Sequence, residues 1–177
     1  MDKFAALKAL GAGDFQHLNG SLEAHLQGTQ ALLNRWGADE VLQVAGLFHA
    51  AYGTAGFDDN MVSLAQRDKI ASIIGPQAEA LVYLYCSCDR DFVFPQFGLG
   101  KPIQFKDRFV EREFELSAEL TVAFCELTVA NELELVLASD VFKQQYGEEL
   151  KQLFDDMREY LSPQAKQAYS DALCDLA

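Results

Sequence analysis

The sequence predicts an all-α fold on the strength of three observations. Hydrophobic residues recur at steps of three and four along most of the chain, the spacing that places them on one face of a helix. Residues that favour helix ends stand where these periodic stretches begin and stop. Half of the 177 residues are hydrophobic, enough for one sizeable core. We therefore expect one helical domain over residues 1–177, with a core over 15–138 and a C-terminal helical extension over 139–177.

The N-terminal stretch predicts a short helix followed by a loop. Residues 3–10 carry apolar and small side chains at helical spacing, and the pattern stops at Gly11. The glycine-rich segment over residues 11–16 has no core pattern, so it predicts a loop that leads to His17.

Two clear helices follow, each with its own end signals. Ser21 is the expected N-cap of the first helix, and Gly37 is its expected C-terminal stop. Asp39 is the expected N-cap of the second helix, which we expect to end at Gly53.

His25 and His49 fall on the apolar stripes of these two helices. We therefore expect both to point into a shared pocket, with an amide or hydroxyl group close by. The alternative is that both are neutral core histidines, hydrogen-bonded across the helix pair. The remaining histidine of the chain, His17, is either an exposed loop residue or a third nitrogen ligand. The stripes are made of Leu22, His25, Thr29, Leu32 and Trp36, and of Leu42, Ala45, His49 and Tyr52.

The middle of the chain predicts two more helices. Ser63 and Gln66 form a capping-box pattern for a helix that runs to Ile74. Pro76 suits the first position of the next helix, whose period continues to about Cys88.

Residues 91–116 interrupt the helical pattern. They hold two of the four prolines and short alternating runs, which predicts a long loop or a small hairpin. Their phenylalanines are either a lid over the pocket or a hydrophobic cap. Ser117 then begins the most apolar helix, which we expect in the centre of the fold. Asn131 lies inside it and needs a hydrogen-bond partner, because an unpaired buried amide is costly.

The C-terminal tail predicts three helical pieces, divided at Ser139, Gly147 and Ser162. Its charged outer faces suggest added surface and contacts for a homo-oligomer. The formal net charge of −13 argues against nucleic acid and anionic membranes as partners, since both are bound through clustered Lys and Arg.

The compartment we expect is the cytoplasm. Asp2 and Lys8 make the N-terminus a poor signal peptide, and no run of hydrophobic residues reaches a membrane-spanning length. The four cysteines sit inside apolar helical patterns, so we expect buried free thiols. The cysteines are Cys86, Cys88, Cys125 and Cys174.

The histidine region resembles the HD superfamily of metal-dependent phosphohydrolases. His25 on one helix is followed by AGLFHAAYGT over residues 45–54 and by LTVANEL over residues 127–133. The family pattern is a lone His, then Ala-x-Leu-x-His-Asp, then a distant Asp. The segments resemble the hydrolase domain of ppGpp hydrolases, and over about residues 15–135 they are most similar to a group of uncharacterised HD-like domains.

Two positions depart from that family pattern. Ala50 stands where the family has the Asp of His-Asp, and Asn131 stands where it has the final Asp. Both carboxylates that would neutralise a divalent metal are therefore missing. The resemblance leaves His25 and His49 as candidate ligands of a divalent transition metal, and His17 could join them as a third nitrogen ligand.

Further residues are expected in the small-molecule pocket. Tyr52 and Thr54 would supply hydroxyl groups, although the simpler interpretation is that Thr54 bonds nearby backbone at the helix end and Tyr52 fills the helix interface. Asp89 and Arg90 are either a solvated pair or an anchor for an anionic ligand. The complete predicted pocket set is Tyr52, Thr54, Asp89, Arg90 and Asn131.

Two functions remain open from the sequence. The first is a metal-dependent hydrolase or oxygenase with a small-molecule pocket at His25, His49 and Asn131. The second is a catalytically inactive HD-like domain that binds a ligand or a protein. Hydrolysis of ppGpp is disfavoured, because the metal carboxylates and the Glu-Asp pair that follows the family histidine are missing.

Overall fold

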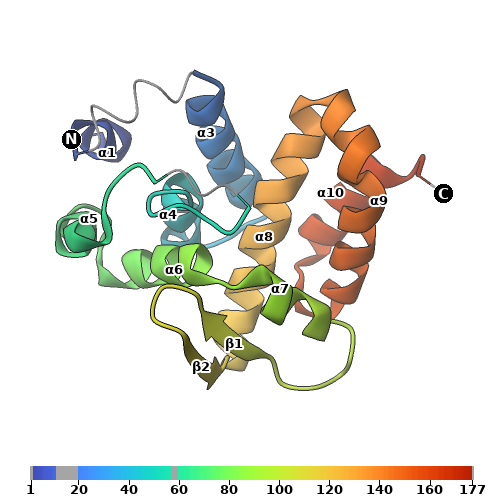
Figure 1. The fold of residues 1–177 in the computed structure, drawn as a ribbon. Coiled ribbons are helices and arrows are strands. Elements are labelled where there is room, and N and C mark those ends of the chain that lie inside the picture. The colour runs from blue at the N-terminus through green and yellow to red at the C-terminus, as the bar shows by residue number, and fades with distance from the viewer. Residues whose placement is uncertain (1, 11–19, 57–59, 177) are drawn as a thin grey trace.

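The chain is mostly helical in the computed structural model, which describes residues 2–10, 20–56 and 60–176. This confirms a helical fold, and a two-stranded hairpin is added to it (Figure 1). The α-helices are α1 (Lys3–Leu10), α3 (Gly20–Arg35), α4 (Glu40–Phe48), α5 (Arg67–Ile74), α6 (Pro76–Ser87), α7 (Arg90–Val93), α8 (Ala118–Ala138), α9 (Asp140–Asp156) and α10 (Pro163–Leu173). Short 3₁₀ turns cover Leu64–Gln66, Phe94–Gln96 and Arg158–Tyr160, and the strands are β1 (Gln104–Asp107) and β2 (Arg112–Glu115).

Helix α8 runs through the centre of the molecule, as expected (Figure 1). It packs against α3, α4, α6, α9 and α10. Ser117 caps its N-terminus by accepting a hydrogen bond from the backbone N–H of Leu120 at 3.2 Å. A helix with neighbours on most sides is apolar nearly all round, which explains why this stretch is the most hydrophobic of the chain.

Helices α3 and α4 form a pair whose ends are only partly as predicted. Asp39 caps α4 by accepting from the backbone N–H of Leu42 at 2.8 Å, and Gly37 adopts a φ of 78° after α3. Ser21 is not the N-cap of α3, because the helix already includes Gly20.

Helix α4 ends at Phe48, earlier than the predicted stop at Gly53. Two successive tight turns replace the helical pattern: the backbone N–H of Ala51 bonds Phe48, and that of Gly53 bonds Ala50. His49 is therefore the C-cap of the helix, at the point where the chain leaves it.

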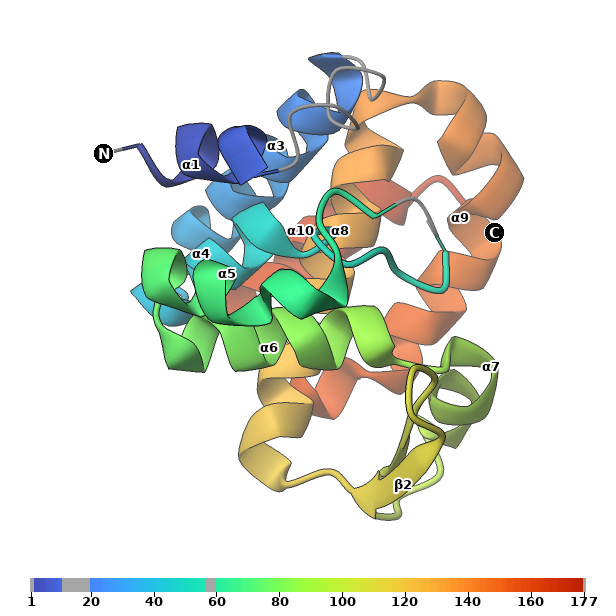
Figure 2. The same cartoon turned by 60° about the vertical axis from the view of Figure 1, so that its left-hand side comes forward.

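Helices α5 and α6 lie side by side (Figure 2). The predicted capping box is present, since the Gln66 side chain accepts from the Ser63 backbone at 3.1 Å. It opens a 3₁₀ turn rather than α5 itself. Gly75, with a φ of 91°, separates α5 from α6, and Pro76 occupies the first position of α6.

The segment over residues 91–116 contains the predicted hairpin and a short helix that was not predicted. Strands β1 and β2 pair antiparallel, with Phe105 opposite Phe114. Phe97 and Phe105 are buried, and both rings pack against Phe124 of α8. These two phenylalanines thus belong to the core.

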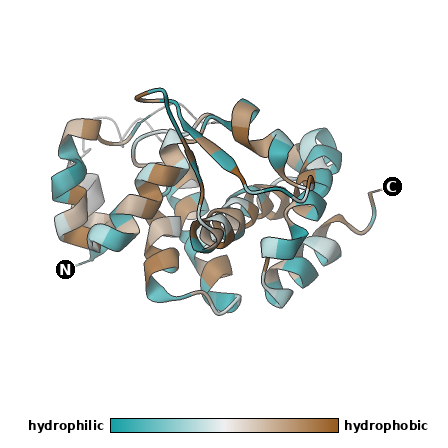
Figure 3. Cartoon of the chain, turned by 90° about the horizontal axis from the view of Figure 1, so that it is seen from below, coloured by the Kyte–Doolittle hydropathy of each residue, from teal (hydrophilic) through white to brown (hydrophobic). Residues whose placement is uncertain are grey.

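The C-terminal tail forms two helices joined by a 3₁₀ turn, and the predicted break at Gly147 is wrong. Helix α9 passes through Gly147, where an added Cβ would lie 2.5 Å from the Leu176 side chain. The Leu176 side chain packs closely against the helix at this position. Brown and teal alternate along most helices in Figure 3, the pattern of amphipathic helices around a core.

The cysteines are free, and three of them are buried as expected. Cys174, the C-cap of α10, is exposed. Within the described ranges, no helix combines the length and the apolar character needed to cross a membrane.

Candidate functional site

A pocket of about 880 Å³ opens between α3, the end of α4, α7, α8 and α9. Its polar floor consists of His25, His49, Arg90 and Asn131. Its α9 wall consists of Phe142, Tyr146, Leu150 and Leu153. The remaining lining residues are Leu22, Ala50, Thr54, Gly56, Phe94, Glu132, Leu135 and Glu149.

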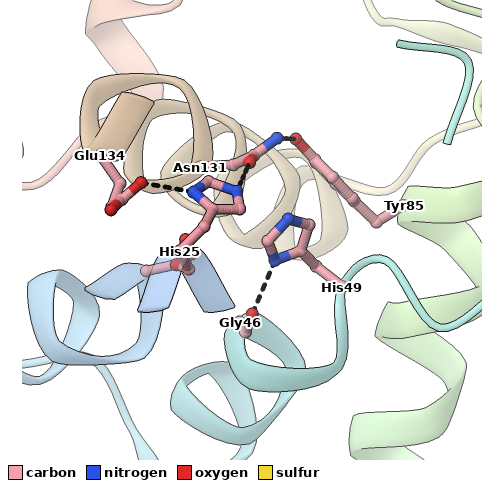
Figure 4. Close-up of polar contacts among 7 residues, drawn as sticks. His25, Gly46, His49, Tyr85, Asn131 and Glu134 are labelled. Atoms are coloured by element: carbon pink, nitrogen blue, oxygen red, sulfur yellow. Dashed lines mark hydrogen bonds and ion pairs between the residues drawn. The ribbon is translucent and has the colours of Figure 1, made fainter. Parts of the chain in front are cut away.

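A chain of hydrogen bonds crosses the floor from α8 to α3, back to α8 and on to α6 (Figure 4). His25 pairs through Nδ1 with the carboxylate of Glu134. Its Nε2 lies 2.7 Å from Oδ1 of Asn131. The amide nitrogen of Asn131 donates to the hydroxyl of Tyr85, also at 2.7 Å. The buried Asn131 thus has the partner that its position in an apolar helix required.

Both ring nitrogens of His25 face oxygen acceptors. A carboxylate oxygen cannot donate, and the amide oxygen of Asn131 cannot either. Both ring nitrogens of His25 are therefore engaged within the floor, one by Glu134 and the other by Asn131. Gly28 makes room for this pair, since a Cβ there would lie 2.9 Å from Cγ of Glu134.

His49 lies beside His25, and the centres of the two rings are 5.2 Å apart. Its side chain is buried, and Nδ1–H donates to the carbonyl of Gly46 at 2.7 Å. Burial, with smaller contributions from the nearby His25 and Arg90, lowers the pKa of His49 from 6.5 to about 3. The ring is therefore neutral, and because Nδ1 holds the hydrogen, Nε2 carries a lone pair.

Arg90 extends the floor from the first position of α7. Its Nη1 donates to Glu132 at 3.2 Å, and both side chains of this ion pair are largely buried. Its Nη2 lies 3.4 Å from the Tyr85 hydroxyl. Gly56 lies directly against the guanidinium, since a Cβ there would be 2.6 Å from Nη1. Arg90 is thus held in place and its charge is balanced inside the protein.

The structure brings together some of the predicted site residues and separates others. Thr54 lines the pocket and is buried. Tyr52 does not line it, because its hydroxyl donates to Glu79 at 2.8 Å, outside the pocket. Asp89 does not line it either: it caps α7 through the backbone N–H of Phe92. His17 lies outside the described residues.

Glu132, Glu134 and Tyr85 belong to the floor network and were not predicted. A signal for Glu134 was available, because residues three apart on a helix share a face and Asn131 was already a candidate. The same spacing gives no signal for Glu132, whose role depends on Arg90 arriving from α7.

The floor does not fit the divalent metal that the HD resemblance implies. Both nitrogens of His25 are engaged, Ala50 offers no ligand atom, and Asn131 has both ends of its amide bonded. Nε2 of His49 is the ring nitrogen left with a lone pair in this histidine pair. Across the described part of the chain, His, Cys, Asp and Glu nowhere form a group of three or more that could hold a metal ion.

Comparison with known proteins gives one match. Residues 6–90 match the model of a family described as a domain of unknown function, DUF6817. No curated protein and no solved structure matches the chain. The matched stretch carries His25, His49 and Arg90 but ends before Asn131 and the α9 wall.

Proposed function

We propose that this chain is an HD-like helical domain that binds a small molecule in the α3–α9 pocket without metal-dependent chemistry. The observation that carries the proposal is the hydrogen-bonded chain from Glu134 through His25 and Asn131 to Tyr85. Two of the positions that correspond to metal ligands in the HD superfamily, His25 and Asn131, are here hydrogen-bonded to each other. An HD-like site that has lost its carboxylates retains its cavity, and the cavity can still serve recognition.

The shape and lining of the pocket support recognition of a small molecule. Its volume of about 880 Å³ falls within the range of roughly 300–1,000 Å³ that is usual for ligand sites. Polar groups converge on one end, and apolar side chains of α9 line the other. Such a division orients a ligand through a few polar contacts and holds it by apolar burial.

The second candidate function is a metal-dependent hydrolase or oxygenase at the same residues. The observation that favours it is the approach of the two imidazole rings to 5.2 Å. For this function His25 would have to leave Glu134 and Asn131 and turn a nitrogen toward His49. That change leaves a buried amide and a carboxylate without their partner, at a cost of about 1–3 kcal/mol for each group.

The first experiment separates these two functions by metal content. The protein is produced in medium supplemented with Fe, Zn, Mn, Ni and Co, purified without chelator and analysed by mass spectrometry. We expect far less than one metal per chain and a melting temperature that EDTA does not change. A stoichiometric metal that is lost in His49→Ala would replace the binding proposal with the metal-dependent one.

A second experiment tests the pocket with a matched pair of variants on α8. Leu135 lines the pocket, whereas Leu137 is 60% exposed and does not line it. Leu135→Trp should fill the cavity and abolish binding of an apolar aromatic probe such as 2-naphthol, measured by calorimetry. Leu137→Trp should bind as the parent does. Equal binding by both variants would place the probe elsewhere and remove the support for the pocket.

The same proposal keeps the cytoplasm as the compartment and excludes nucleic acid as a partner. The free buried thiols and the net charge of −13 support these two points. A homo-oligomer through the tail stays a prediction, which light scattering on the purified chain would test.

A further inference from the structure

The charges around the pocket are balanced inside the protein. Arg90 is paired with Glu132, and His25 is paired with Glu134. These four side chains have the charged groups nearest the floor, and each faces its own counter-charge. Glu149 also lines the pocket, but it is exposed on α9, where water solvates its carboxylate. The floor therefore offers no uncompensated charge to a ligand.

A charged ligand would have to break one of these pairs. An anion that binds Arg90 would leave Glu132 without its partner. The Glu132 side chain is only 12% exposed, so water cannot take the place of Arg90. Removing one partner of a buried pair is strongly unfavourable. The net charge of −13 also opposes the approach of an anion. A cation meets the reverse problem, since Glu132 and Glu134 already hold Arg90 and His25.

His49 adds a hydrogen-bond acceptor to the lining of the pocket. Its Nδ1–H is engaged by the Gly46 carbonyl, so Nε2 can only accept a hydrogen bond. The complementary group is an O–H or N–H on the ligand. Because its one N–H is engaged by Gly46, the neutral ring of His49 has no donor left for a carboxylate or phosphate.

The rest of the pocket is suited to an apolar or aromatic body. The rings of Phe142 and Tyr146 on α9 contact each other in a tilted arrangement, with ring centres 4.8 Å apart. Leu135, Leu150 and Phe94 continue this lining toward the floor. Aromatic rings bury large areas against such side chains, and this contact supplies most of the affinity of an apolar ligand.

We infer that the ligand is an uncharged, largely apolar molecule, aromatic in at least one part, that donates one hydroxyl or N–H to Nε2 of His49. This inference rests on the proposed binding function and names its ligand class. His49 is then the residue that favours a ligand with a hydroxyl or N–H over a ligand of the same shape that lacks this donor.

The test uses four naphthalene derivatives of nearly the same size at about pH 7. They are 2-naphthol, 2-methoxynaphthalene, 2-naphthoate and 2-naphthylmethylammonium, each titrated by calorimetry into the full chain. We expect 2-naphthol to bind most tightly, about tenfold more tightly than the methoxy compound that lacks the donor. We expect weaker binding still from the anion and the cation.

A His49 variant and a spectroscopic measurement identify the acceptor. His49→Phe keeps an aromatic ring and removes the lone pair, so 2-naphthol and 2-methoxynaphthalene should bind it equally. A readout that needs no variant is the ¹⁵N resonance of Nε2 in the parent protein, which should shift with 2-naphthol and stay unchanged with the methoxy compound.

The outcomes separate this inference from the proposed function. Tighter binding of the anion or the cation, still blocked in Leu135→Trp, would overturn the ligand class and leave the pocket standing. Equal binding of 2-naphthol and 2-methoxynaphthalene to the parent would overturn the hydrogen bond to His49. Failure of all four compounds to bind would count against the binding function itself.

Discussion

Acidification should destabilise this protein through His49, and the size of the effect follows from its burial. The imidazole has a pKa of 6.5 in the unfolded chain and about 3 in the folded one. Between these two values the unfolded state binds one more proton than the folded state. The free energy of unfolding therefore falls as the pH falls, by about 1.4 kcal/mol per pH unit at most. The stabilisation is fully present above about pH 6.5.

The magnitude at about pH 5 can be worked out from the same values. That pH lies about 1.5 units below the unfolded pKa and well above the folded one, so His49 alone removes about 2 kcal/mol. Other groups also titrate in this pH range, so their contribution is removed by comparing the parent with a variant that lacks His49. His49→Asn does not titrate, and its amide can still donate to the Gly46 carbonyl.

The assay is urea unfolding followed by circular dichroism at several pH values from about 7.5 to 5. We expect the parent to lose about 2 kcal/mol more than His49→Asn over this interval, whatever their stabilities at neutral pH. Parallel loss in the two proteins would refute the reasoning, because it would mean that His49 titrates alike in the folded and unfolded chains.

Two further changes should lower stability for stated reasons. Gly28→Ala places a Cβ against Glu134 and should displace Glu134 from His25. We expect the free energy of unfolding in urea to fall by about 1–2 kcal/mol. Unchanged stability would mean that Glu134 moves aside without cost. Arg67→Met should cost about 2 kcal/mol, because it strips the bidentate partner at 2.6 and 2.9 Å from the buried Glu79. Adding Glu79→Gln should recover part of that loss, and no recovery would mean that the packing of Arg67, rather than its charge, matters.

The helix starts that a nearby side chain caps could be predicted from the sequence. Asp39 and Ser117 act through hydrogen bonds to the backbone within three residues, so the signal and its effect lie together in the sequence. Gly147 shows where such local reasoning fails. A glycine is a common helix stop, but here the contact with Leu176, far along the chain, decides its role.

The candidate site also has features that were expected from the sequence and features that were not. The convergence of His25, His49 and Asn131 was expected from periodicity and from the HD resemblance, and the structure places them together. The pairing of Arg90 with Glu132 was not expected, because it depends on how α7 packs against α8. That pairing changes the interpretation of Arg90 from an anchor for anions to a balanced charge.

The two halves of the pocket come from parts of the chain that can vary separately. His25, His49 and Arg90 lie within the stretch that matches the family model, whereas the α9 wall lies beyond it. Substitutions at Phe142 or Leu150 would alter the shape presented to a ligand and leave the floor bonds untouched. A protein built this way can acquire a new ligand preference by changes on one outer helix, while the residues that hold its centre together stay as they are.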